Sequence, residues 1–258
     1  MIVILSPAKS LDFETAAPCK SPTQPVFASQ AAKLMKTLRQ CSADDLCDLM
    51  HLSEKLGELN FQRNRKWKAT HDAKNSKAAV YAFQGDVYQG MDIDQFSAAQ
   101  VRRCQKHVRI LSGLYGILQP LDLIQPYRLE MGTKLATKAG KNLYEFWGDT
   151  VADAIAADLR KQKSRLLINL ASNEYSKVAK LKDLDADVIS PAFREWKNGQ
   201  FKMISFFAKR ARGAMTRYLI SNSITTAEGM LDFDLDGYRY DKKLSSESEP
   251  VFTRKQSV

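Results

Sequence analysis

The sequence predicts an α/β (α+β) protein with a mixed sheet flanked by helices. Residues 1–6 and Leu166–Leu170 are short apolar runs with the length and composition of buried strands. Several other stretches carry apolar residues three and four positions apart, as amphipathic helices do. Asn198-Gly199, between two strand-like segments, indicates a hairpin with a type I′ turn. No repeat or linker divides the chain, so we expect a single domain over residues 1–258.

The first helix is expected after a proline-containing loop at residues 21–25. Ser29 is its predicted N-cap, because a serine hydroxyl can accept a hydrogen bond from a first-turn amide. Four apolar residues at helical spacing predict its buried face: Ala31, Leu34, Met35 and Leu38.

Residues 43–66 are expected to form an inserted pair of helices, Ala43–Met50 and Glu54–Lys66, joined by His51-Leu52-Ser53. The pair resembles a helix-hairpin-helix, which grips duplex phosphates through backbone amides. The usual hairpin glycines are missing, so an ordinary helical corner is the alternative. Six residues are expected to supply its packing: Leu46, Leu49, Met50, Leu52, Leu56 and Leu59.

Three elements are expected in the middle of the chain: a strand at residues 80–87 and helices at 98–112 and 144–161. Ser97 is the predicted cap of the second element, and Gly113 and Gly116 are expected to end it. Its predicted buried stripe is Val101, Cys104, Val108 and Leu111.

The predicted hairpin near the C-terminus consists of residues 188–196 and 200–207. A helix is expected to follow at once, because apolar residues recur there at helical spacing. They are Phe207, Ala211, Met215 and Tyr218. Short strands are expected around Tyr238 and residues 251–253.

The composition favours a polyanionic partner. The 258 residues include 39 Lys and Arg against 29 Asp and Glu, which gives a net charge of +10. No stretch approaches the roughly 18 apolar residues that a membrane span needs. The apolar run at residues 1–6 is too short for a signal-peptide core, so we expect a cytoplasmic protein without membrane contact.

The four cysteines and three histidines are scattered, so we expect no metal site and no cofactor. Cys41 and Cys47 are six positions apart, and a peroxide-sensing thiol is one interpretation. The alternative, which we prefer, is that the cysteines pack as small apolar residues.

The segment from Arg194 to Arg217 carries seven cations and one acid, Glu195. Lys209, Arg210 and Arg212 are expected in the opening turns of a helix, where cations oppose the helix dipole and a bound phosphate would relieve the repulsion. A solvated basic face is the alternative. The full set of cations is Arg194, Lys197, Lys202, Lys209, Arg210, Arg212 and Arg217.

Two further groups of cations fit the same interpretation. One surrounds Trp67 and consists of Arg63, Arg65, Lys66 and Lys68, and Lys55 lies in the same pair of helices. The other is expected on one helix and consists of Arg102, Arg103, Lys106 and Arg109. Core packing of Trp67 is favoured over base stacking.

Polar residues after the buried strand Leu166–Leu170 suggest a small-molecule pocket. In α/β sheets, ligands gather where strands end and helices begin. Lys9 also follows a strand, and Arg128 and Glu130 lie on a loop. The pocket candidates are Lys9, Arg128, Glu130, Asn169, Glu174 and Tyr175. Helix capping by Ser172 and Glu174 is the structural alternative.

Seven segments along nearly the whole chain resemble one known family. They are Ser6-Pro-Ala-Lys9, Phe83-Gln-Gly-Asp-Val-Tyr88, Leu111-Ser-Gly-Leu-Tyr-Gly116, Gln125-Pro-Tyr-Arg-Leu-Glu-Met-Gly132, Asn169-Leu-Ala-Ser-Asn-Glu-Tyr175, Lys209-Arg-Ala-Arg-Gly213 and Val251-Phe-Thr-Arg254. Together they resemble the YaaA family of bacterial peroxide stress-response proteins.

The resemblance implies a cytoplasmic protein that is induced by hydrogen peroxide and limits damage from intracellular iron. It also implies an unusual α/β fold, linked to recombination and DNA repair, that binds double-stranded DNA through a helix-hairpin-helix and a basic cleft. The hairpin module would be residues 43–66. The cleft would contain Lys9, Arg128, Lys177, Lys209, Arg210 and Arg212.

Two functions are therefore weighed. The first is a non-catalytic protein that binds double-stranded or structured DNA through phosphates, with little sequence preference. Its expected contacts are Lys55, Arg63, Arg65, Lys66, Lys177, Lys209, Arg210, Arg212 and Arg217. The second is an enzyme acting on a nucleotide or a flipped base in the pocket. Glu130 and Glu174 distinguish the two functions. A protein that only binds phosphates has no use for carboxylates in its cleft, unless these carboxylates cap helices or pair with Arg128.

Overall fold

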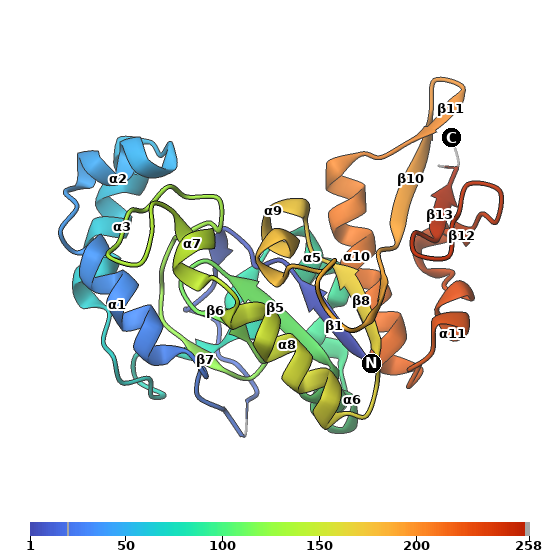
Figure 1. The fold of residues 1–258 in the computed structure, drawn as a ribbon, viewed down its shortest axis with the longest axis horizontal. Helices are drawn as coiled ribbons and strands as arrows, with labels where there is room; N and C mark the ends of the chain where they lie inside the picture. The colour runs from blue at the N-terminus through green and yellow to red at the C-terminus, as the bar shows by residue number, and fades with distance from the viewer. Residues whose placement is uncertain (20, 256–258) are drawn as a thin grey trace.

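The computed structural model describes residues 1–19 and 21–255, and its centre is a five-stranded sheet (Figure 1). The strand order is β6-β5-β1-β8-β9, and all neighbours are parallel except β5 and β6. The strands are β1 Ile2–Leu5, β5 Val108–Ser112, β6 Gly116–Leu118, β8 Leu166–Leu170 and β9 Asp187–Ile189.

Strand β1 lies in the middle of the sheet and is buried on both faces. Its register pairs Val3 with Val108 on one side and with Ile168 on the other. The chain moves from β1 to β5 in one direction and from β5 to β8 in the other. Because parallel crossovers are right-handed, the helices α6 and α8 that precede β5 and β8 lie on opposite faces. This covering explains why the central strands are continuous apolar runs.

The first part of the chain forms three helices beside the sheet, α1 Ala28–Leu38, α2 Ala43–Met50 and α3 Glu54–Lys66. Further short elements lead to β5. They are β2 Ser10–Leu11, β3 Lys77–Ala78, α4 Ala79–Ala82, β4 Phe83–Gln84, α5 Asp86–Met91, the 3₁₀ helix η1 Ile93–Gln95 and α6 Ala98–His107. Strand β2 pairs with β4, and β3 pairs with β7 Leu123–Ile124.

The second part contains α7 Leu143–Trp147, α8 Thr150–Lys161, α9 Asn173–Ser176, η2 Lys177–Ala179, α10 Ser205–Ser221, α11 Ala227–Leu231 and η3 Leu235–Gly237. A second, mixed sheet has the order β11-β10-β13-β12. Its strands are β10 Ala192–Lys197, β11 Gln200–Lys202, β12 Arg239–Tyr240 and β13 Val251–Arg254.

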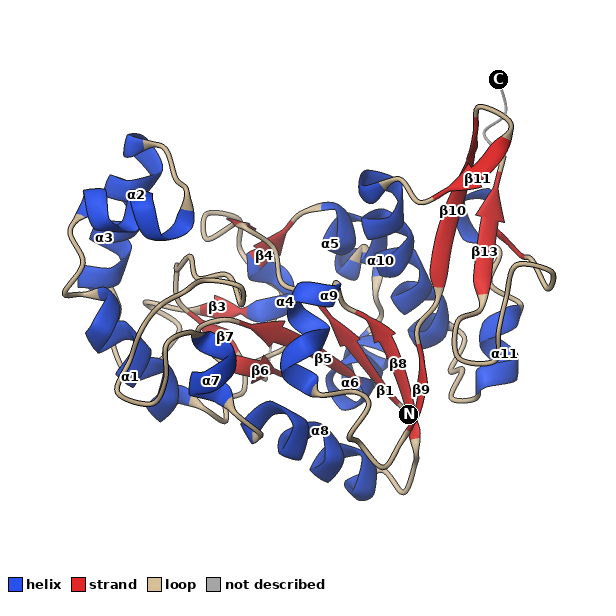
Figure 2. Ribbon diagram, turned by 45° about the horizontal axis from the view of Figure 1, so that its top comes forward, coloured by secondary structure: helices blue, strands red, loops and turns tan. Residues whose placement is uncertain are grey.

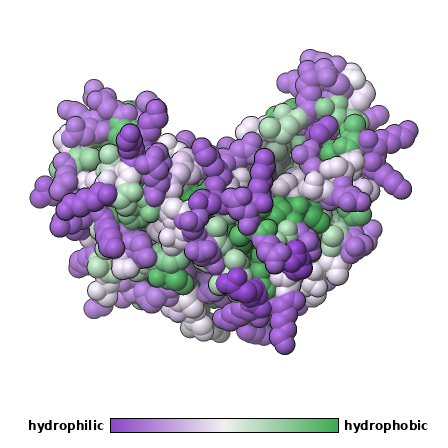
Figure 3. Space-filling view, in the orientation of Figure 1, coloured by the Kyte–Doolittle hydropathy of each residue, from purple (hydrophilic) through white to green (hydrophobic). Residues whose placement is uncertain are grey.

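Two raised ends flank the central sheet. We call α1, α2 and α3 the helical arm, and the β10–β13 sheet with α11 the hairpin arm; they lie at the left and right of Figure 1. Figure 2 shows that the carboxyl ends of β1 and β8 point into the space between the arms. The space-filling view is hollowed there, and mainly hydrophilic residues border the hollow (Figure 3).

Several predicted elements are confirmed. The strands at the N-terminus and at Leu166–Leu170 and the helices Ala43–Met50 and Glu54–Lys66 have the expected bounds to within a residue or two. Asn198 and Gly199 have φ values of 52° and 79°, as a type I′ turn requires. The short strands near the C-terminus are also present.

The predicted helix at residues 98–112 is wrong in its second half. Ser97 caps α6 with Gln100 as its capping-box partner, but the helix ends at His107 and the chain continues as β5. Arg109 is therefore not on a basic helical face. It is 4% exposed and pairs with Asp158 at 2.6 Å.

Other predictions also need correction. The strand expected at residues 80–87 is instead the series α4, β4 and the start of α5. The helix at 144–161 is divided by Gly148, which has a φ of 51°. The segment 188–196 belongs to two strands in different sheets, and the segment 200–207 already contains the start of α10.

Two details of the helical arm differ from the sequence-based expectation. Helix α1 has Phe27 at its N-cap position, and Ser29 lies inside the helix, although the expected four residues are buried. Leu46 and Met50 pack as expected in the α2–α3 pair, but Leu56 and Leu59 are 36% and 42% exposed.

Within the described part of the chain, no helix is both long and apolar enough to cross a bilayer.

Candidate nucleic-acid interface and pocket

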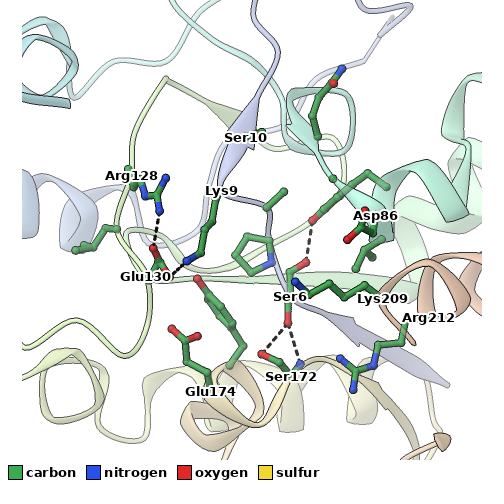
Figure 4. Close-up of a pocket in the computed structure, with 18 of the residues that line it drawn as sticks. Ser6, Lys9, Ser10, Asp86, Arg128, Glu130, Ser172, Glu174, Lys209 and Arg212 are labelled. Carbon is green, nitrogen blue, oxygen red and sulfur yellow. Dashed lines mark hydrogen bonds and ion pairs between the residues drawn. The ribbon is translucent and has the colours of Figure 1, made fainter. Parts of the chain in front are cut away.

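A pocket of about 360 Å³, here called the central pocket, lies at the carboxyl ends of β1 and β8. Parallel strands end at the same edge of a sheet, so residues about 165 positions apart meet there. The polar and charged side chains around it come from five segments (Figure 4). They include Ser6, Lys9, Ser10, Gln84, Asp86, Tyr88, Tyr127, Arg128, Glu130, Ser172, Glu174, Tyr175, Lys209 and Arg212.

The floor of the central pocket is fixed by hydrogen bonds between the two strand ends. The backbone amide of Ser172 donates to Ser6 Oγ at 2.8 Å, and the two serine hydroxyls are 3.3 Å apart. Tyr88 OH donates to the carbonyl of Ser6 at 3.1 Å. Burial raises the pKa of Tyr88 well above its ordinary value, so its hydroxyl stays protonated as a donor.

One wall of the central pocket is built around the Glu130 carboxylate. Its two oxygens pair with Lys9 Nζ at 2.7 Å and with Arg128 Nη2 at 3.0 Å. The Arg128 Nε atom is buried and has no hydrogen-bond partner among the described residues. The wall is therefore a preformed ion-pair network with one unused donor.

Glu174 occupies the neighbouring position, where it joins two loops. One of its carboxylate oxygens, Oε1, accepts a hydrogen bond from the amide of Gly132 at 2.8 Å. The hydroxyl of Tyr144 donates to its backbone carbonyl at 2.9 Å. No hydrogen bond to a described residue uses the other carboxylate oxygen, which is available to a ligand.

The opposite wall is helix α10, which supplies Lys209 and Arg212. Figure 4 shows both side chains pointing from the helix toward Ser6 and Ser172. Arg212 is partly buried, and burial lowers its pKa. The ion pairs of the described residues include neither Lys209 nor Arg212. Two cations thus point into the pocket without an ion pair to a described acid, although the Asp86 carboxylate also lines this pocket.

The position of α10 depends on two glycines. A Cβ on Gly213 would lie 1.8 Å from the carbonyl oxygen of Val87, and a Cβ on Gly90 would lie 2.1 Å from that of Arg210. Helices α5 and α10 therefore touch backbone to backbone. This contact places Lys209 and Arg212 opposite Asp86, which lies at the start of α5.

A second hollow of about 560 Å³, here called the α2 pocket, continues the central pocket toward the helical arm. The two share Lys9, Arg128, Glu130 and Glu174. The α2 pocket adds the C-terminal end of α2 and the loop after Gly132, including Asp48, His51 and Lys134. Together the two pockets form a cleft that extends from α10 to α2.

Exposed cations occupy both arms beside the cleft. On α3, Lys55, Arg65 and Lys66 are exposed, whereas Arg63 is half-buried. Burial, together with the nearby charge of Arg128, lowers the pKa of Arg63. On the other side the exposed cations are Lys197, Lys202, Lys209 and Arg210.

Apolar side chains are interleaved with the cations of the hairpin arm and of the start of α10. Trp196, Met203 and Phe206 are 43%, 65% and 51% exposed. Lys255 lies 4.9 Å above the ring of Trp196. In contrast, Trp67 is 4% exposed and donates to Tyr115 OH, so the prediction that it packs in the core is confirmed.

The structure brings together most of the residues predicted for a pocket. Lys9, Arg128, Glu130, Glu174 and Tyr175 all line the central pocket. Asn169 does not, because it lies within β8 rather than after it. Its amide bonds Ser190 Oγ and the backbone of Ala171.

The predicted DNA contacts are spread more widely. Lys209 and Arg212 line the central pocket and Arg210 is exposed beside it. Lys177 instead lies 4.6 Å above the ring of Tyr144. Arg217 is 3.6 Å from Asp92, away from the pocket.

The helix-dipole argument for a phosphate at residues 209–212 does not hold. Helix α10 begins at Ser205, so the three cations lie beyond its first turn, where the dipole effect has faded. The basis for an anion site is instead the pair of unneutralised cations in the pocket wall.

Asp86 lies within residues 80–87, which the sequence predicts as a strand, and Tyr88 directly follows them, so neither is among the predicted site residues. Their segment, Phe83-Gln-Gly-Asp-Val-Tyr88, is nevertheless one of the strings on which the family resemblance rests. Among residues 1–19 and 21–255, no three His, Cys, Asp or Glu side chains are grouped so that they could hold a metal ion.

The fold and the site define a class of protein: an α/β protein with a charged cleft at the carboxyl edge of a parallel sheet, between two raised arms. Comparison with known proteins then gives the family. Residues 1–244 match the family model described as "Peroxide stress protein YaaA". The chain therefore belongs to the peroxide stress protein YaaA family, as its sequence motifs indicated.

Curated relatives match over their whole length. The chain is 50% identical to a UPF0246 protein of Janthinobacterium sp. (strain Marseille) over 258 residues, which cover 100% of both chains. It is 49% identical to a UPF0246 protein of Saccharophagus degradans over 256 residues, or 99% of this chain and 100% of the relative. It is also 51% identical to a UPF0246 protein of Polynucleobacter asymbioticus over 254 residues, or 98% of each.

Proposed function

We propose that this protein binds double-stranded or structured DNA across its cleft and thereby limits iron-dependent oxidative damage to DNA during peroxide stress. The observation that carries the proposal is the presence of exposed cations on both arms of a hollow surface. Membership of a peroxide stress family agrees with it. Bound protein would shield the DNA backbone and grooves that it covers.

The distribution of charge favours phosphate contacts by the arms rather than by the floor. The central pocket is lined by four cations and three carboxylates, so its charge is nearly balanced. The exposed cations of α3 share their helix with Glu54 and Glu58. On the β10–β11 hairpin, Lys197 and Lys202 are exposed and the one acid, Glu195, is buried and paired with Arg254. Phosphate contacts of this kind give affinity with little sequence preference and a strong dependence on salt.

The α2–α3 corner supports a contact at the helical arm. Ser53 is the N-cap residue of α3, but its side chain makes no capping hydrogen bond, so first-turn amides stay available. Lys55 follows in the same turn, and His51 and Ser53 are exposed. A phosphate at this corner would be bound as in a helix-hairpin-helix, although the hairpin glycines are missing.

A second candidate is an enzyme that acts on a nucleotide or a flipped nucleobase in the same cleft. The specific observation in its favour is the unused carboxylate oxygen of Glu174 inside the central pocket. The other carboxylate, Glu130, is paired with Arg128, which is the arrangement expected of a binder. The non-catalytic function is therefore the main proposal.

A salt titration of duplex binding tests the main proposal. Wild-type protein should bind with a steep log–log slope, and Lys197→Ala/Lys202→Ala on the hairpin arm should weaken binding and lower the slope by up to about 2, since each phosphate contact contributes about 0.9. The matched control is Lys161→Ala/Lys163→Ala, which removes two exposed cations at the end of α8, away from the cleft. Weak binding by the wild type that does not respond to salt would overturn the proposal.

A further inference from the structure

We propose that the central pocket binds a single nucleoside monophosphate unit, with its phosphate on α10 and its base or sugar on the Glu174 side. This nucleotide could come from two sources. One is an unpaired position in bound DNA, and for this source the proposal rests on the proposed function. A free nucleotide is the other source.

The charges that line the central pocket are unevenly distributed between its two walls. Lys209 and Arg212 lie on one wall without ion pairs, with Asp86 near their side of the pocket, and the carboxylates of Glu130 and Glu174 lie on the opposite wall. A ligand that satisfies both walls must carry an anion at one end and hydrogen-bond donors at the other. A continuous phosphate backbone offers only the anion, and carboxylates repel it.

The α10 side of the central pocket has the groups that a phosphate requires. The side chains of Lys209 and Arg212 converge on the hydroxyls of Ser6 and Ser172. Ser6 Oγ is held by the Ser172 amide, and this bond orients both hydroxyls at the pocket floor. Two cations and a hydroxyl donor are a suitable set for a phosphate, because charge-assisted hydrogen bonds are about twice as strong as neutral ones. A bound phosphate would also neutralise the partly buried Arg212.

The Glu174 side of the central pocket has the groups that would bind the base or the sugar. The free Glu174 oxygen can accept a hydrogen bond from a base amino group or a sugar hydroxyl. The buried ring of Tyr175 lies beside it in the pocket lining. Each oxygen of Glu130 is already paired, one with Lys9 and the other with Arg128, and this pairing fixes the wall. Donor recognition is therefore assigned to Glu174.

Size and access agree with a ligand of this class. The volume of about 360 Å³ lies near the lower end of the range of ~300–1,000 Å³ for small-molecule sites, as one nucleotide unit requires. Phe206, 51% exposed, is one turn before Lys209 on α10 and therefore lies on the same helical face.

Isothermal titration calorimetry with dAMP, dCMP, dGMP and dTMP tests the pocket directly. At least one nucleotide should bind at least tenfold more tightly than inorganic phosphate or the corresponding deoxynucleoside, because only the nucleotide reaches both walls. Arg212→Gln and Glu174→Gln should each weaken that binding at least tenfold. Glutamine keeps a carbonyl oxygen for the Gly132 amide, so Glu174→Gln preserves the loop contact.

The matched controls are Arg160→Gln on α8 and Glu247→Gln near the C-terminus, both exposed and outside the pocket. They should leave nucleotide binding unchanged.

A second assay separates the two sources of nucleotide. A duplex with one unpaired nucleotide should lose at least threefold in affinity on Glu174→Gln, while the fully paired duplex does not change. If free nucleotides bind but this difference is absent, the ligand is a free nucleotide. If no nucleotide binds and Glu174→Gln affects neither duplex, the pocket proposal is overturned even when the paired duplex binds. Failure of the wild type to bind the paired duplex contradicts only the proposed DNA-binding function.

Discussion

At the scale of single residues, the Tyr115 hydroxyl connects the helical arm to the central sheet. It accepts hydrogen bonds from Trp67 Nε1 at 3.1 Å and from the Gln125 amide at 3.2 Å, and it lies 3.0 Å from His71 Nε2. Its single proton must therefore go to His71, which fixes that ring as the neutral tautomer protonated on Nδ1. The Nδ1 atom donates to the carbonyl of Ala69.

Removal of this hydroxyl should destabilise the protein strongly. Tyr115→Phe leaves two buried donors and one buried acceptor unsatisfied, at about 1 kcal/mol or more each, so the free energy of unfolding should fall by about 3 kcal/mol. Urea denaturation measures the loss. Tyr144→Phe, which removes one partly buried hydroxyl, is the control and should cost about 1 kcal/mol. Equal losses for the two variants would contradict the network.

The same network predicts a dependence of stability on pH. Burial lowers the pKa of His71 below its ordinary value of 6.5, so the folded protein holds fewer protons than the unfolded chain in this range. The stabilisation is present above pH 6.5 and is lost as the pH falls below it, by up to about 1.4 kcal/mol per pH unit.

The test compares the free energy of unfolding of the wild type and His71→Gln at pH 7.5 and 5.5. The advantage of the wild type should shrink at the lower pH. His107, whose pKa is also lowered by burial, and Asp122, whose pKa burial raises to about 6, contribute equally to both proteins and cancel. An advantage that does not change with pH would show that folding leaves the pKa of His71 unshifted and would contradict the prediction.

At the scale of elements, the sequence predicted those whose signals are local. Helices α2 and α3 were placed correctly because apolar spacing and a serine before each helix mark their limits. Strand β5 was missed because α6 runs into it without an intervening Gly or Pro, and Val108 and Leu111 continue the helical spacing by coincidence. Only its parallel pairing with β1, about a hundred residues away, makes this segment a strand.

The contact between α5 and α10 gives the prediction at this scale. Gly213→Ala would place a methyl group against the Val87 carbonyl, where the backbone leaves no room. The helices must separate, so the variant should lose about 2 kcal/mol or more of stability, in the range of overpacked cores.

Because Lys209 and Arg212 move with α10, Gly213→Ala should also weaken duplex binding. Gly229→Ala is the control, since a Cβ there meets side-chain atoms of Ile224 and Thr226 at 3.0 Å or more and no backbone atom within that distance. Thermal unfolding and a binding titration measure the two effects. A Gly213→Ala protein as stable as the control would contradict backbone contact between α5 and α10.

At the scale of the whole molecule, the sequence predicted the residues of the site better than it predicted their arrangement in space. The sequence places Lys9 and Glu174 after strands and Arg128 on a loop. The shared edge of the sheet brings the three side chains together. Asn169 was wrong by about one residue, because a side chain inside β8 faces its neighbours instead of the edge. The arms could not be predicted, since the placement of α1–α3 and of the second sheet depends on long-range packing. That residues 1–258 fold as one domain stays a prediction.

The two sides of the cleft give the last prediction. If DNA crosses the hollow, phosphates must contact both sides, and the contributions of distant cations should add. Lys55→Ala/Lys134→Ala on the helical side and Lys209→Ala/Arg210→Ala on the α10 side should each lower the salt slope of duplex binding by up to about 2, and the four changes together by up to about 4. Fluorescence anisotropy over a range of salt measures the slopes, and Lys161→Ala/Lys163→Ala is again the control. If either pair leaves the slope at the wild-type value, the duplex lies along one side of the cleft only and does not cross it.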